Sequence, residues 1–88
     1  MLKPEYTNQF KKELVLMLRR GKDKQKIAGV ISRLVNQIPL EPKHRDHALT
    51  GNFKGRRDCH IEPDWLLIYK VGADVITFER TGTHSDIF

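Results

Sequence analysis

The chain has 88 residues, of which 39% are hydrophobic and 31% charged, and its formal net charge is +5. A chain of this length and composition is expected to form one globular domain over residues 1–88 and is too apolar for a disordered segment. No apolar run approaches the roughly 20 residues that cross a bilayer, and no apolar signal-peptide core follows the first methionine. The single cysteine, Cys59, excludes an internal disulfide framework. We therefore expect a cytoplasmic protein with no membrane partner.

The positive charge is concentrated in the first part of the chain. Residues 1–38 contain nine lysines and arginines against three acidic residues, whereas residues 39–88 contain seven against eight. The basic residues are densest over residues 19–26. Such a surface suits a polyanion, either a nucleic acid or an acidic protein segment, although a solvated helix face has the same composition.

Two amphipathic helices are predicted in this basic half. Thr7 or Asn8 can cap the first helix, and Gly21 can end it. Asp23 can cap the second, and Gly29 within it is expected to allow close packing against the first. The apolar residues recur at helical spacing at Phe10, Leu14, Met17 and Leu18, and then at Ile27, Val30, Ile31, Leu34, Val35 and Ile38. The pattern stops at Pro39, and the two helices are predicted to form an antiparallel hairpin.

The second half has the period of β-strands. Residues 39–54 are predicted to be an ordered loop, followed by strands over residues 55–62, 65–71 and 75–81 with short turns between them. A weaker strand is predicted over residues 3–6. In the first of the three strands, alternation directs Arg57, Cys59 and Ile61 to one face and Arg56, Asp58, His60 and Glu62 to the other. The expected fold class is α+β, a helical hairpin packed on a small, mostly antiparallel sheet of three to four strands that leaves the other sheet face partly open.

The polar residues of this half are those that metal-independent RNA cleavage requires. A base must accept the 2′-hydroxyl proton, an acid must protonate the leaving 5′-oxygen, and cations must neutralise the phosphate. Histidine suits both proton transfers, because its ordinary pKa of about 6.5 lies near working pH. The candidates for proton transfer are His47, His60 and His84, with Asp64 to assist. The candidates for binding phosphate are Lys54, Arg56 and Arg57, and those for stacking on a base are Trp65, Tyr69 and Phe88.

Each of these residues also has an ordinary structural explanation. Trp65 at the start of a strand is typical of a core residue, Asp64 after Pro63 is typical of a turn, and arginines on an edge strand are usually solvated. Cys59 is most simply a small buried hydrophobe. A zinc site is the competing chemistry, since His44 and His47 are three residues apart, but paired helical or Cys-x-x-Cys spacing is absent.

Three segments carry a more specific signal. They are Asp-His-Ala-Leu-Thr-Gly at residues 46–51, Arg-Asp-Cys-His-Ile-Glu-Pro-Asp-Trp-Leu-Leu-Ile-Tyr at 57–69, and Arg-Thr-Gly-Thr-His-Ser-Asp-Ile-Phe at 80–88. Together they resemble the YafQ-type toxins of the RelE/ParE superfamily of bacterial toxin–antitoxin systems. The resemblance covers residues 46–88 by motif, and the helical hairpin before them agrees in arrangement only.

This resemblance implies an endoribonuclease that cuts messenger RNA in the ribosomal A site and inhibits translation. The functional positions of the family fall on His47, His60, Asp64, Trp65, His84 and Phe88. Among these residues we expect His84 to be the general acid, because it lies on the C-terminal segment together with Phe88. His60 or His47 is the expected base, with Asp64 orienting an imidazole or acting itself. Lys54, Arg56 and Arg57 are then expected to bind phosphate, and the terminal carboxylate of Phe88 to lie beside the site. The expected product is a 2′,3′-cyclic phosphate, with no metal and no other cofactor.

The implied partners are the ribosome with its mRNA and a cognate antitoxin whose own N-terminal domain binds operator DNA. The basic first half then has two readings, as a surface for ribosomal RNA or for an acidic antitoxin segment. The alternatives are a ParE-like gyrase inhibitor, an RNA-binding module without chemistry and a zinc-dependent hydrolase. The presence of all four candidate acid–base residues argues against the gyrase inhibitor.

Overall fold

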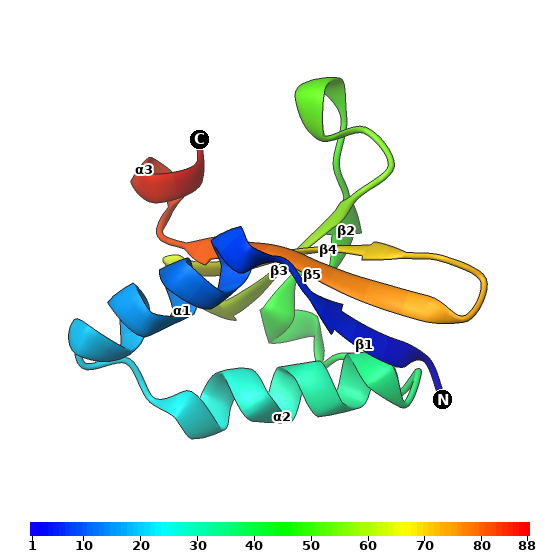
Figure 1. Ribbon diagram of the computed structural model, residues 1–88, viewed down its shortest axis with the longest axis horizontal. Helices are drawn as coiled ribbons and strands as arrows, with labels where there is room; N and C mark the ends of the chain where they lie inside the picture. Colours follow the sequence, from blue (N-terminus) through cyan, green and yellow to red (C-terminus); the bar gives the residue numbers. More distant parts are fainter.

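The computed structural model describes residues 1–88 and contains one mixed sheet with α-helices on both sides of it (Figure 1). The elements in chain order are β1 (Lys3–Tyr6), α1 (Asn8–Arg19), α2 (Lys24–Val35), β2 (His47–Ala48), β3 (Arg57–Glu62), β4 (Trp65–Val71), β5 (Val75–Gly82) and α3 (His84–Ile87). Two short 3-10 helices, η1 (Pro42–His44) and η2 (Gly51–Phe53), lie on either side of β2. None of the helices is long and apolar enough to span a membrane.

The predicted helix boundaries are confirmed at three of the four ends. The Thr7 side chain accepts the backbone N–H of Phe10 in the first turn of α1, and the Asp23 side chain accepts that of Gln25 in the first turn of α2. Gly21 follows α1 with φ +91°, the left-handed conformation that glycine adopts without steric cost. The end of α2 was predicted one turn too late. The helix stops at Val35, Gln37 takes φ 58°, and the side chain of Ile38 is exposed.

The sheet has five strands in the order β1-β5-β4-β3-β2. The predicted antiparallel meander of β3, β4 and β5 and the weaker prediction of β1 are confirmed. β1 pairs with β5 in parallel, which requires the crossover that α1 and α2 provide. The fifth strand, β2, lies inside the predicted loop and pairs His47 with Asp58 and Ala48 with Arg57.

The core lies between the two long helices and one face of the sheet. It joins Phe10 and Met17 of α1 and Ile27 of α2 to Leu67 of β4 and Phe78 of β5. The opposite sheet face is not open at its centre, contrary to expectation, because Leu66 and Ile68 have no exposed surface. Figure 1 shows α3 and the loop around η2 on that side of the sheet and α2 on the other.

The expected role of Gly29 in helix packing is wrong. A Cβ atom built on Gly29 meets no atom within 4 Å, so the glycine does not lie against α1. It lines a surface cavity together with Lys26, Arg33 and His44. In Figure 1, α1 and α2 diverge from the turn that joins them.

Candidate active site

Three of the four histidines lie close together beside the sheet. Asp58 and His60 project from the same face of β3, as the alternation predicted, and β2 places His47 opposite Asp58. His84, at the start of α3, reaches the same place from the end of β5. The ring centres of His60 and His84 are 5.5 Å apart, with the rings nearly perpendicular, and His47 Nε2 lies 3.8 Å from Asp58 Oδ2. The fold thus gathers His47, His60 and His84 from three separate segments.

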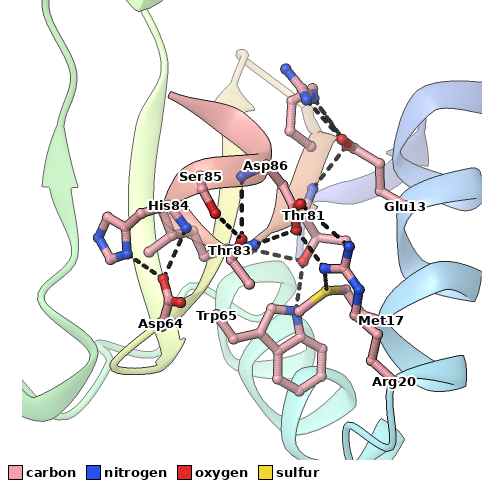
Figure 2. A network of polar contacts seen from close by, with 12 residues as sticks. Glu13, Met17, Arg20, Asp64, Trp65, Thr81, Thr83, His84, Ser85 and Asp86 are labelled. Carbon is pink, nitrogen blue, oxygen red and sulfur yellow. Dashed lines mark hydrogen bonds and ion pairs between the residues drawn. The ribbon is translucent and has the colours of Figure 1, made fainter.

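Asp64 holds His84 through two contacts (Figure 2). Its Oδ1 accepts the backbone N–H of His84 at 2.9 Å and lies 2.6 Å from the ring Nδ1 of the same residue. The His84 backbone N–H, followed by its side chain, holds the pKa of Asp64 below its ordinary value, so Asp64 is ionised at neutral pH. Because a carboxylate only accepts, Nδ1 carries the hydrogen in this contact and Nε2 is left to face solvent and substrate. This is the arrangement in which a carboxylate holds an imidazole in one tautomer and one orientation.

Asp58 is a member of the cluster that the list of candidate residues missed. Its side chain is buried, Oδ1 has no hydrogen-bond partner, and Oδ2 faces His47. Burial raises the pKa of Asp58 above its ordinary value, and the positive charges of His60, His47 and His84 oppose that rise. A signal was available in the sequence, because strand alternation places Asp58 on the face of His60.

His60 differs from the other two histidines in its surroundings. Burial lowers its pKa below the ordinary value, with the charge of Asp58 acting in the opposite direction. His60 is therefore neutral at pH 7 and able to accept a proton. The strand is held beneath it by His44, whose Nδ1 donates to the backbone carbonyl of His60 at 2.6 Å.

A pair of aromatic rings, one exposed and one half-buried, and two cationic residues lie on the side of η2 and α3. Phe88 is 60% exposed, and its ring meets the edge of Phe53 with centres 5.3 Å apart. Arg56 lines a surface depression with Phe53 and donates to Glu79 at 2.6 Å. Lys54, next to Phe53 in the chain, is exposed and makes no ion pair.

The structure contradicts the assignment of two residues, Trp65 and Arg57, to substrate binding. Trp65 has no exposed surface, and its indole N–H donates to the Thr81 hydroxyl at 2.9 Å within the protein. It cannot stack on a base, and neither can the buried Tyr69. Arg57 points to the helix side of β3, away from His60, and its guanidinium donates to Asp46 at 3.2 Å. The alternation along β3 separates Arg57 from the histidines.

The zinc alternative would need several ligand side chains that converge on one point. No group of three or more His, Cys, Asp or Glu residues has the geometry to hold a metal ion. The paired contacts of His84 with Asp64 and of His47 with Asp58 instead resemble the carboxylate–imidazole pairs of acid–base catalysis.

The fold of this chain is shared with solved bacterial toxins. The crystal structure of YafQ from E. coli strain BL21(DE3) superposes with a TM-score of 0.94 at 42% identity, covering 100% of this chain and 99% of that chain. The E. coli DinJ–YafQ complex gives a TM-score of 0.92 at 43% identity, again covering 100% and 99%. The class is therefore a small α+β toxin of a toxin–antitoxin system.

Sequence comparison defines the family. The family described as "Bacterial toxin of type II toxin-antitoxin system, YafQ" matches residues 2–88, and the chain belongs to it. The mRNA interferase toxin YafQ of Escherichia coli strain K12 is 45% identical over 85 residues, covering 96% of this chain and 92% of that protein. The resemblance noted over residues 46–88 thus extends through the helical half.

Proposed function

We propose that this toxin is a ribosome-dependent endoribonuclease that cleaves mRNA in the A site and needs no metal ion for the chemistry. Its relative of 45% identity is named an mRNA interferase, and the DinJ–YafQ complex supports a neutralising antitoxin as partner. The cleavage is an attack of the 2′-hydroxyl on the adjacent phosphorus, which leaves a 2′,3′-cyclic phosphate and a 5′-hydroxyl. The enzyme acts in the cytoplasm, where translating ribosomes are.

The single observation that carries the proposal is the pair of facing imidazoles, His60 and His84, with ring centres 5.5 Å apart. Transfer of a phosphoryl group between two oxygens of RNA needs a proton acceptor at one oxygen and a donor at the other. His60 is the base, because burial lowers its pKa and keeps the ring neutral. His84 is the acid, because Asp64 binds its Nδ1 and orients the ring so that the opposite nitrogen, Nε2, faces outward to the leaving oxygen.

His47 and Asp58 support this pair from the other side. The carboxylate of Asp58 lies beneath His47 and raises the pKa of His60 against the effect of burial. It therefore keeps His60 basic enough to remove a proton while leaving it neutral at pH 7. His47 lies beside the reacting phosphate, where a ring N–H can donate a hydrogen bond to the developing negative charge.

The RNA extends from this cluster towards η2. Arg56 and Lys54 bind phosphates there, and the exposed ring of Phe88 stacks on a base. The basic residues of the first half bind ribosomal RNA, for which phosphate contacts supply salt-sensitive affinity. Trp65 and Arg57 take no part in binding, since one is buried and the other faces away from the histidines.

Primer extension on a defined message tests the proposal, with purified toxin added to the message alone or to programmed ribosomes. New ends inside the A-site codon only in the presence of ribosomes are the expected result. His84→Ala and Asp64→Ala are expected to abolish these ends while the circular dichroism spectrum stays unchanged. Ends at many positions without ribosomes would contradict ribosome dependence, and wild-type cleavage by both variants would contradict the site.

A further inference from the structure

The helix that carries His84, α3, is too short to be stable by itself. α3 has four residues, none of its side chains is buried, and Phe88 follows immediately after it. Isolated helices shorter than about 12 residues are marginal in water even in favourable sequences. The placement of His84 and Phe88 must therefore come from the contacts that α3 makes with the rest of the protein.

One of these contacts comes from outside the active site. Arg20, at the end of α1, binds the Asp86 carboxylate with both terminal nitrogens, at 2.7 Å to Oδ2 and 3.4 Å to Oδ1 (Figure 2). A guanidinium that meets a carboxylate through two nitrogens fixes its orientation as well as its distance. Arg20 also holds the pKa of Asp86 well below its ordinary value, so the pair is charged throughout the neutral range.

The same carboxylate closes the first turn of α3. Asp86 Oδ2 accepts the backbone N–H of Thr83 at 2.9 Å, and the Thr83 hydroxyl accepts the backbone N–H of Asp86 at 3.2 Å. The two residues thus form a capping box. Since Arg20 binds the acidic member of that box, it connects the N-terminus of α3 directly to α1.

The attachment point on α1 is itself firmly held. The backbone N–H of Arg20 bonds to Leu16 and Met17, and its guanidinium contacts the sulfur of the buried Met17 at 3.5 Å. Two turns earlier on the same helix, Glu13 binds Arg80 at 2.7 Å and the backbone N–H of Thr81 at 3.2 Å. Figure 2 shows both attachments, so α1 holds the end of β5 through Glu13 and α3 through Arg20.

We infer that Arg20 is a positioning residue for the reaction, which acts through Asp86 to hold His84 and Phe88 in place. The inference rests on the proposed function for its catalytic consequence, but the order of α3 can be measured without any activity. Arg20 touches no reacting group, since its contacts are with Asp86 and α1.

The structural arm of the test is ¹⁵N relaxation of the free toxin as wild type and Arg20→Gln. In the wild type, residues 83–88 are expected to have order parameters near 0.85, and in Arg20→Gln to fall below about 0.6. The matched control is Arg19→Gln, which removes the same charge from an exposed neighbour that makes no ion pair. It is expected to leave residues 83–88 ordered, and the melting temperatures of both variants serve to confirm that they are folded.

The kinetic arm is single-turnover cleavage at saturating ribosome concentration. Arg20→Gln is expected to slow the cleavage step by about tenfold, because small misplacements of catalytic groups have effects of this order. Arg20→Lys keeps one donor and is expected to recover part of the rate. Arg19→Gln is expected to change only the ribosome concentration needed for saturation. In the double variant with Asp86→Asn, the two losses should not multiply, because the residues act as one unit.

Each outcome decides the inference. Unchanged order parameters in Arg20→Gln overturn it, even where cleavage slows, because the arginine then acts on RNA directly. A wild-type rate at saturation also overturns it. If the wild-type toxin cuts no RNA, the proposed function fails, and the relaxation arm still decides whether Arg20 holds α3.

Discussion

Replacing Trp65 by phenylalanine tests whether this residue belongs to the hydrophobic core or binds substrate. The indole ring has no exposed surface and packs in the cluster that joins both long helices to the sheet. Its N–H donates to the Thr81 hydroxyl at 2.9 Å, and that hydroxyl donates in turn to the backbone carbonyl of Leu66 at 2.8 Å. Phenylalanine keeps an aromatic ring but removes the donor and part of the volume.

The expected loss of stability follows from these two changes. Removing the buried hydrogen bond costs about 1 kcal/mol. The smaller ring leaves a cavity of about 40 Å³, which at about 24 cal/mol per Å³ costs about 1 kcal/mol more. For a protein of this size, about 2 kcal/mol corresponds to a fall in melting temperature of roughly 8–16 °C.

The assay is thermal unfolding by circular dichroism together with cleavage at saturating ribosome, measured well below the melting temperature. Trp65→Phe is expected to lose stability and to keep the wild-type rate. Phe88→Ala is expected to give the opposite result, because the Phe88 ring is exposed. The variant should lose at most about 1 kcal/mol of folding stability, from the contact with Phe53, and should bind RNA more weakly. A Trp65→Phe protein with unchanged stability and impaired cleavage would refute the assignment of this residue to the core.

Three further predictions concern charge and helix propensity. Asp58→Asn removes a negative charge that raises the pKa of His60, so the pKa of this base should fall. In a pH–rate profile, the acid limb of kcat/KM, which reports protonation of the base, should therefore move to lower pH. Arg20 lowers the pKa of Asp86, so this pair stabilises the fold above pH about 3.9 and is lost as pH falls through the lowered pKa. In an acid titration of the wild type followed by ¹⁵N relaxation, residues 83–88 should therefore remain ordered at pH about 3.9 and lose their order only at lower pH, whereas in Arg20→Gln they are mobile at neutral pH already. Gly29→Ala should raise stability by about 1 kcal/mol in denaturant unfolding, because a Cβ there meets nothing and helix propensity improves.

Local sequence patterns predicted most of the helices and strands, because the formation of these elements depends on residues that are close together in the chain. The stripes of α1 and α2, their caps at Thr7 and Asp23, and the turns around β4 are all set by residues a few positions apart. The alternation in β3 also placed Asp58 with His60 and Arg57 on the other face. Assigning Arg57 to phosphate because of its charge disregarded that alternation, and the structure agrees with the alternation.

The features that the sequence did not reveal depend on distant partners. β2 has only two residues and exists because His47 and Ala48 pair with β3, about ten positions further along the chain. The parallel pairing of β1 with β5 and the contact of Arg20 with Asp86 join opposite ends of the chain. Trp65 was expected both in the core and on RNA, and only the packing of the helices over β4 decides between them.

The position of β5 between β1 and β4 has a consequence for the nascent chain. β1 is made first and β5 last, yet β1 has no other strand to pair with, and α1 packs on the core that β5 completes. Contacts between such distant segments form late and slowly, since a large loop must close first. His84, Asp86 and Phe88 follow β5, so the ribosome that synthesises this toxin has to add all five strands and residues 83–88 before the proposed site can assemble.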